Sequence, residues 1–229
     1  MTISSTKWPI GLVLCLLPLL SLGQGEFTGF WQPQMAVNYK VSGTYSHNLS
    51  LAHRIYFVDE GESGFRGRHL DLVHFSKLEL SDNQSIALGI QYRYRDLFEQ
   101  NPNELRLVQQ YNFTQKPLAV RFGHRFRSEQ RITKLLTVHR FRYRFAVDFP
   151  LKGEKLNLGE PFLVISLEGL ASFAKSSSPE YDARITSQLG WKFDKGFKLL
   201  VGTQYRAENY TATKPDHILF LLTGVQLSL

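Results

Sequence analysis

Arginine is the residue type best placed to do chemistry in this chain, because it recurs at alternate positions along several stretches. The densest group is Arg121, Arg125, Arg127 and Glu129, with Arg131 beside it, followed by Arg140, Arg142, Arg144 and Asp148. The same pattern adds Arg93, Arg95, Glu104, Arg106, Arg184, Arg206 and Glu208, which complete the predicted charged set. Guanidinium groups hold carboxylates and phosphates through charge-assisted hydrogen bonds. A lumen lined by this set would attract small anions.

The charged set is equally consistent with a network of internal ion pairs. Neighbouring arginines repel one another where water is scarce, so they need carboxylates among them. We expect this pairing from five acids that share the polar side of the strands, namely Glu104, Glu129, Asp148, Asp182 and Glu208. A narrow barrel filled by ion pairs and a cationic, anion-binding lumen are therefore both open interpretations.

Groups for catalysis or metal binding form no recognisable pattern. The histidines are scattered, and none has the spacing that pairs it with a second metal ligand. His69-x-Asp71, with His74 nearby, is the nearest approach to a site, and the chain has no glycine-rich phosphate loop. We expect no catalytic residue, no metal and no cofactor, and hence not an enzyme.

A period of two residues dominates from residue 27 to the end. Phe141, Tyr143 and Phe145, for example, alternate with the arginines of 140–144. Such alternation is typical of strands with one apolar and one polar side. It predicts eleven strand segments at about 27–40, 44–57, 68–80, 84–96, 103–114, 117–129, 134–149, 160–174, 179–194, 196–208 and 215–229.

These segments predict a closed, antiparallel, up-and-down transmembrane β-barrel. They are longer than the usual strand of a soluble protein and long enough to cross a bilayer. Their apolar sides lack Lys, Arg, Asp and Glu, and aromatic residues gather near their ends. Single-chain bacterial barrels have an even number of strands. We therefore expect about twelve strands, from a split of the first segment at Pro33, with ten as the alternative.

The N-terminal segment indicates export. Lys7 precedes an apolar run from Trp8 to Leu20, followed by small residues near Gly23. This pattern is typical of a secretory signal peptide. We expect residues 1–24 to be cleaved and residues 25–229 to form one barrel domain. The only cysteine, Cys15, lies in the cleaved part, so no disulfide is expected.

The chain carries several short motifs rich in arginine and aromatic residues: Gly29-Phe30-Trp31, His53-Arg54, Gly89 through Arg95, Glu104-Leu105-Arg106, Arg125 through Arg131 and His139 through Arg144. Together they resemble a family of bacterial outer-membrane barrels of unknown function, the DUF2490 type. The resemblance implies an exported barrel and supplies no catalytic residues. The last strand alternates up to Leu229, which is similar to the signal read by the barrel-assembly machinery, although that signal usually ends in an aromatic residue.

The expected role is structural or transport-like, as a narrow pore or an anion-binding lumen in the outer membrane of a Gram-negative bacterium. The expected partners are outer-membrane lipid, the assembly machinery and a small anionic solute. One alternative is a secreted, lipocalin-like soluble barrel that binds an apolar ligand. Another is an outer-membrane barrel hydrolase or lipid-modifying enzyme. The net charge of +7 would suit nucleic acid, but alternation places arginine and aromatic rings on opposite sides, so we expect no nucleic-acid partner.

Overall fold

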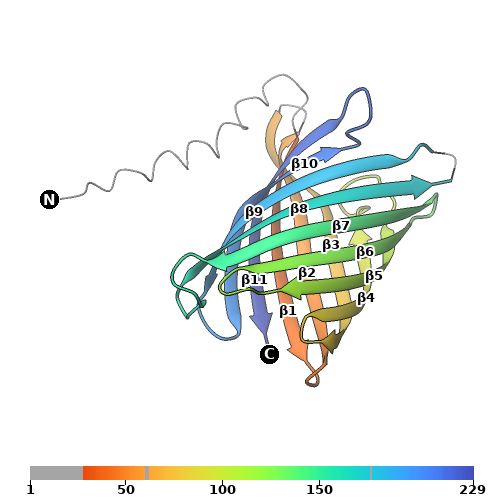
Figure 1. The fold of residues 1–229 in the computed structure, drawn as a ribbon. Coiled ribbons are helices and arrows are strands. Elements are labelled where there is room, and N and C mark those ends of the chain that lie inside the picture. Colours follow the sequence, from red (N-terminus) through yellow and green to blue (C-terminus); the bar gives the residue numbers. More distant parts are fainter. Residues whose placement is uncertain (1–27, 60–61, 176) are drawn as a thin grey trace.

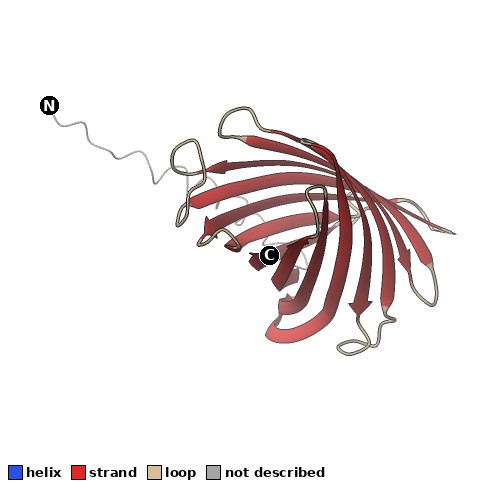
Figure 2. Cartoon of the chain, turned by 90° about the horizontal axis from the view of Figure 1, so that it is seen from below, coloured by secondary structure: helices blue, strands red, loops and turns tan. Residues whose placement is uncertain are grey.

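The computed structural model describes residues 28–59, 62–175 and 177–229, and every regular element in them is a β-strand (Figures 1 and 2). The strands are β1 Thr28–Lys40, β2 Tyr45–Asp59, β3 Glu62–Ser81, β4 Gln84–Tyr94, β5 Glu104–Gln115, β6 Arg121–Ile132, β7 Thr137–Pro150, β8 Pro161–Ala174, β9 Glu180–Lys192, β10 Phe197–Glu208 and β11 Asp216–Ser228. None of the described residues belongs to a helix that could cross a membrane. The predicted signal segment 1–24 lies outside the described residues.

The strands close into one barrel in which each strand pairs with its neighbours in the chain, and β1 pairs with β11. The eleven predicted segments are confirmed, whereas the expected count of twelve, with ten as alternative, is wrong. Hairpins reverse the chain at each step, so the first and last of an odd number of strands run in the same direction. The closure is therefore parallel, from Thr28↔Ile218 to Asn38↔Ser228, and the barrel is mixed rather than wholly antiparallel.

The predicted split at Pro33 does not occur, because β1 runs through this residue. Pro33 pairs with Thr223 of β11, while the ladder to β2 is interrupted at Gln32 and Pro33. Because proline has no N–H to donate, it fits a strand where the hydrogen-bonded ladder is interrupted, as the β1–β2 ladder is at this position. The seam also has a side-chain bond, because Trp31 Nε1 donates to Thr223 Oγ1 over 3.1 Å.

The barrel has two rims that the parity of the strands defines. We call the end where β1 begins the N rim, and the end where β11 finishes the C rim (Figure 1). The fully described connections at the N rim are 95–103, 133–136 and 209–215, and those at the C rim are 41–44, 82–83, 116–120, 151–160 and 193–196. The described chain therefore starts and finishes at opposite rims.

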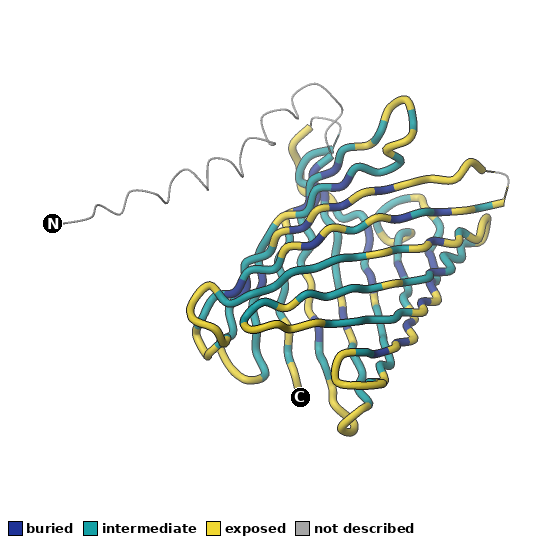
Figure 3. The backbone as a smooth tube through the Cα atoms, viewed as in Figure 1, coloured by how far each residue is buried: buried dark blue, intermediate teal, exposed yellow. Residues whose placement is uncertain are grey.

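Buried and exposed residues alternate along many of the strands (Figure 3), and the buried positions include many charged side chains whereas the exposed positions include many apolar ones. Arg93, Glu104 and Glu129 are buried, while Leu88 and Leu167 are more than half exposed. A barrel with an apolar interior would show the reverse pattern. One buried apolar cluster lies inside the N-rim half, beside the parallel seam, and comprises Phe30, Tyr56, Ile218 and Phe220 with Leu222 against it.

Candidate functional site

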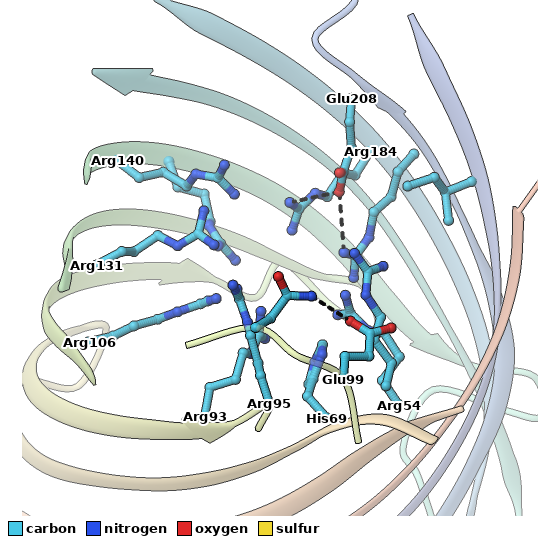
Figure 4. Close-up of a pocket in the computed structure, with 15 residues that line it drawn as sticks. Arg54, His69, Arg93, Arg95, Glu99, Arg106, Arg131, Arg140, Arg184 and Glu208 are labelled. Carbon is cyan, nitrogen blue, oxygen red and sulfur yellow. Dashed lines mark hydrogen bonds and ion pairs between the residues drawn. The ribbon is translucent and has the colours of Figure 1, made fainter. Parts of the chain in front are cut away.

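A cavity of about 270 Å³ lies inside the barrel toward the N rim, and arginine dominates its lining (Figure 4). Ten arginines line it: Arg54, Arg68, Arg93, Arg95, Arg106, Arg131, Arg140, Arg142, Arg184 and Arg206. The other lining residues are His69, Glu99, Asn101, Glu208 and Ile218. The labelled arginines come from several strands around the barrel, so guanidinium groups surround a common space from opposite sides (Figure 4).

Local strand geometry explains most of this lining. Residues two apart on a strand project to the same side, so Arg140 and Arg142 of β7 both point inward, as do Arg93 of β4 and Arg95, the first residue after that strand. The antiparallel register places Arg106 of β5 opposite Arg131 of β6. Like charges thus stack along the wall, and the site requires carboxylates between them.

A β-bulge near the start of β3 adds a further arginine. In the register, Arg54 pairs with His69 while Ile55 pairs with Gly67, which leaves Arg68 without a partner on β2. A bulge inserts an extra residue and re-aims the side chains around it. Both Arg68 and His69 consequently line the cavity, although they are adjacent in sequence.

The connection 95–103 brings Glu99 to the cavity mouth. The Phe98 ring lies 5.1 Å from the His53 ring and packs over Gly67, where a Cβ atom would meet it at 2.6 Å. The Tyr56 hydroxyl donates to Glu99 Oε1 over 3.0 Å, and Asn101 Nδ2 donates to Glu99 Oε2 over 3.0 Å. Glu99 is therefore an anion supplied by a loop rather than by the wall.

Two wall carboxylates each serve a local group of cations. Glu104 is contacted by Arg95 and Arg131, each at 3.0 Å, and by Arg106. The two oxygens of Asp71 accept from Arg93 over 2.6 and 2.7 Å, which is a bidentate pair. Charge-assisted pairs of this kind are the stronger hydrogen bonds of proteins and hold planar groups in one orientation.

A second network runs across the wall from β6 to β10. Glu129 lies 3.2 Å from Arg142, and Glu168 lies 3.4 Å from both Arg142 and Arg184. Arg184 also lies 3.8 Å from Glu208. These cations are shared rather than individually paired, so each carboxylate neutralises only part of the charge around it.

Three cavity arginines lie against the apolar cluster, and one of them, Arg206, also pairs with Glu208 over 3.6 Å. The Arg206 guanidinium carbon is 3.8 Å from the centre of the Phe220 ring, and that of Arg54 is 4.7 Å from the same ring. The Arg68 carbon lies 4.9 Å from the Phe30 ring. Stacking on an aromatic face stabilises a cation without neutralising it. The positive charge of this side of the cavity therefore persists.

Polar atoms of the lining also lack partners among the described residues. The Nε atoms of Arg142 and Arg184 and the Nε2 atom of His69 are buried without a hydrogen bond. His69 Nε2 lies 3.6 Å from Asp71 Oδ2, which is beyond hydrogen-bond distance. Buried polar groups are normally hydrogen-bonded, so these atoms mark a part of the lining whose hydrogen-bonding capacity is not satisfied within the described residues.

The structure gathers part of the predicted charged set at this cavity. Eight of its members line the space: Arg93, Arg95, Arg106, Arg140, Arg142, Arg184, Arg206 and Glu208. Glu104, Arg127 and Glu129 lie in the adjoining ion-pair network. Each of the five acids expected to pair with arginine does so.

The remaining members of the charged set lie apart from the cavity, toward the C rim. Arg121 pairs with Asp148 over 2.7 Å, and the Arg121 side chain is exposed. Arg125 donates from Nε to Asn112 Oδ1 over 3.0 Å. Arg144 faces the same side of β7 as Arg142, and like Arg142 it has a buried Nε atom without a hydrogen bond to the described residues.

The charged set omitted Arg54, Arg68 and Glu99 from the lining, and it omitted Asp71 and Glu168, which pair with lining arginines. Arg54 could have been predicted from the sequence, because the period of two places it on the same side of its segment as Ala52 and Tyr56. A bulge brings the side chain of Arg68 to the cavity, and a loop that turns back over the mouth brings that of Glu99. Neither feature has a periodic signature in the sequence.

A family model described as "Protein of unknown function (DUF2490)" matches residues 28–217. No match to this chain was found among curated proteins or among solved structures. The matched region covers the barrel from the start of β1 into the start of β11, including every residue of the cavity lining up to Glu208. The chain therefore belongs to the DUF2490 family of proteins of unknown function.

Proposed function

We propose that this chain is an outer-membrane β-barrel that binds small anionic solutes in its arginine-lined cavity. The observation that carries the proposal is the inverted distribution of side chains, with apolar groups outside and guanidinium groups inside. Exposed apolar surface is unfavourable in water by about 25 cal/mol per Å². A lipid surrounding removes that cost, and the same inversion is characteristic of outer-membrane barrels.

The dimensions and the outer surface support a membrane location. Each strand has eleven or more residues, and a tilted strand needs about 9–11 to cross the hydrocarbon core. Exposed aromatic side chains lie near both rims, with Phe173 and Tyr181 toward the N rim and Tyr39 and Phe193 toward the C rim. Aromatic residues favour the two interfaces of a bilayer.

This location brings the expected partners with it. The proposed route is export with removal of residues 1–24, followed by insertion by the barrel-assembly machinery into outer-membrane lipid. The proposal excludes nucleic acid as a partner. It assigns no catalytic role to the cavity, whose lining is mostly arginine, a side chain that stays protonated and does not serve as a general base.

Binding is favoured over free passage through an open pore. At mid-height the inward side chains of Ala36, Ser50, Ala87, Val108 and Ser166 are buried. Bulky inward rings lie at this layer and toward the C rim, since a Cβ at Gly89 would collide with Phe75 and one at Gly190, near the C rim, with Phe162. A solute that enters from the N rim therefore meets the arginine cavity before these side chains.

Cell fractionation tests the location, and anion binding by the purified protein tests the role. The mature chain is expected in the outer-membrane fraction and should require detergent for extraction. Its gel mobility should change on heating. In detergent, anions such as sulfate should raise the unfolding temperature more than chloride at equal ionic strength. Recovery in the soluble periplasmic fraction, or equal effects of all anions, would contradict the proposal. An ohmic conductance in planar bilayers would show that solutes pass through the barrel rather than bind in it.

A further inference from the structure

We infer that the cavity is a site for a compact multivalent oxyanion, such as one bearing two phosphoryl groups or several carboxylates. This inference rests on the proposed function, because it specifies which anions the cavity selects. Its starting point is the charge of the lining. Ten arginines line the cavity, and seven carboxylates lie at it or pair with these arginines, which leaves an excess of three positive charges. The seven are Asp71, Glu99, Glu104, Glu129, Glu168, Asp182 and Glu208.

The excess is a lower bound, because cations outside the lining share the same acids. Arg127 lies 3.4 Å from Glu129, and Arg66 lies 3.6 Å from Glu99. Uncompensated charge inside a barrel is unfavourable, since the protein interior screens less than water does. A bound anion with one negative charge would remove only a third of the excess. A multivalent anion offsets all of it at one place.

The positive charge is concentrated beside the apolar cluster. Among the described residues, no carboxylate oxygen lies within 4.0 Å of the guanidinium group of Arg54 or of Arg68. Each of the other eight arginines of the lining has such a partner. Arg54 donates from Nε and Nη2 to the neutral Gln32 Oε1, over 3.2 and 3.0 Å. Its Nη1 group has no such bond. These two residues form the core of the inferred subsite.

Independent evidence comes from the orphaned atoms and from the polarity of the cavity. His69 and Arg184 are more than nine-tenths buried, line the cavity and have ring or guanidinium nitrogens without partners. Nearly all of the surface facing the cavity is polar. An amphiphile with a long apolar tail would find nothing to contact here. A compact anion with many oxygens would satisfy several donors at once.

The loop residue Glu99 shows how such a group would be held at the mouth. Its carboxylate accepts a hydrogen bond from Tyr56 and lies near Arg66. In Figure 4 it projects among the arginines from the opposite side of the mouth to Arg140 and Arg131. Glu99 therefore places a negative charge at the mouth of the cavity and would compete electrostatically with an incoming oxyanion.

The test uses the purified full mature chain in detergent, titrated calorimetrically with pyrophosphate, citrate, acetate and chloride at constant ionic strength. Pyrophosphate and citrate should bind at least tenfold more tightly than acetate. The tighter of these two identifies phosphoryl or carboxylate groups as the preferred chemistry. Equal binding of pyrophosphate and acetate overturns the multivalent class but leaves anion binding intact. Absence of binding by every anion instead overturns the proposed function.

Variants locate the subsite. The double variant Arg54→Gln/Arg68→Gln should weaken pyrophosphate binding at least tenfold, because each lost charge-assisted hydrogen bond contributes strongly to binding. The matched control is Arg121→Gln, which alters an exposed arginine at the C rim and should leave binding unchanged. Heat-modifiable mobility checks the fold of each variant. If the double variant does not fold, Arg54→Lys keeps the charge and should weaken binding severalfold. Unchanged pyrophosphate affinity in the folded double variant, or equal loss in the control, overturns the subsite.

Discussion

An arginine placed on the outer wall would distinguish a lipid environment from an aqueous one. Leu167 lies in the middle of β8, and its side chain is 55% exposed. Its neighbours in the register are Phe145 of β7 and Ile185 of β9, both on the apolar side. The substitution Leu167→Arg therefore puts a guanidinium group at mid-height with no carboxylate beside it in the register.

The two environments predict very different costs. An arginine facing the middle of a bilayer destabilises a barrel by about 2–4 kcal/mol. That range corresponds to a roughly 30- to 700-fold change in the folding equilibrium. In water, replacement of an exposed leucine changes the free energy of unfolding by only about 0.5 kcal/mol. The expected loss is thus several times larger in lipid.

The assay is reversible folding into phospholipid vesicles across a denaturant series, with heat-modifiable mobility as the signal for the folded state. The matched control is Leu135→Arg, because Leu135 is 84% exposed in the N-rim connection 133–136. The control should cost below about 1 kcal/mol, as expected near an interface. If Leu167→Arg costs no more than Leu135→Arg, the outer wall does not face lipid.

Three other substitutions test the interior. Glu129→Gln should destabilise the barrel by about 3–5 kcal/mol in the same folding assay, because Glu129 is 1% exposed and its loss leaves Arg127 and Arg142 poorly compensated. The control Asp148→Asn, at the exposed C-rim pair, should cost less than about 1 kcal/mol. Equal costs for the two variants would argue against a buried network. Gly202→Ala should cost about 1–3 kcal/mol by overpacking, since a Cβ atom there would overlap the backbone oxygen of Ser187. The control Gly169→Ala should be harmless, because a Cβ atom there meets nothing within 4 Å. Similar unfolding midpoints for both variants would refute the close approach at Gly202. Glu99→Gln should raise pyrophosphate affinity severalfold in calorimetry by removing the competing carboxylate, and an unchanged affinity would show that the loop does not compete.

Alternation by itself determined most of the local structure. A strand sends successive side chains to opposite sides, so charge and hydropathy along the chain are enough to mark the strands and to divide each into two faces. Arg140, Arg142 and Arg144 accordingly share one side of β7. The pairing of Glu104 and Glu129 with arginine also follows from charge alone, because several like charges cannot be buried together without counter-charges.

The parts that the sequence could not decide depend on contacts between distant residues. The parallel pairing of β1 with β11 follows from an odd strand count, and the expectation of an even count led away from it. The site draws residues from strands whose separation in sequence says nothing of their distance in space. Arg68 enters through a bulge, which inserts a residue without disturbing the pattern on either side.

The direction of the two faces lies between these cases. Alternation states that one side of each strand is charged and the other apolar, and both senses of closure preserve that alternation. Strand length and the aromatic residues near the strand ends predicted a charged interior, and the closed sheet places the arginines there, because closure is a property of all eleven ladders together. The sequence therefore determined the two surfaces of this barrel and favoured one sense of closure, and the tertiary structure determined which arginines meet in one cavity.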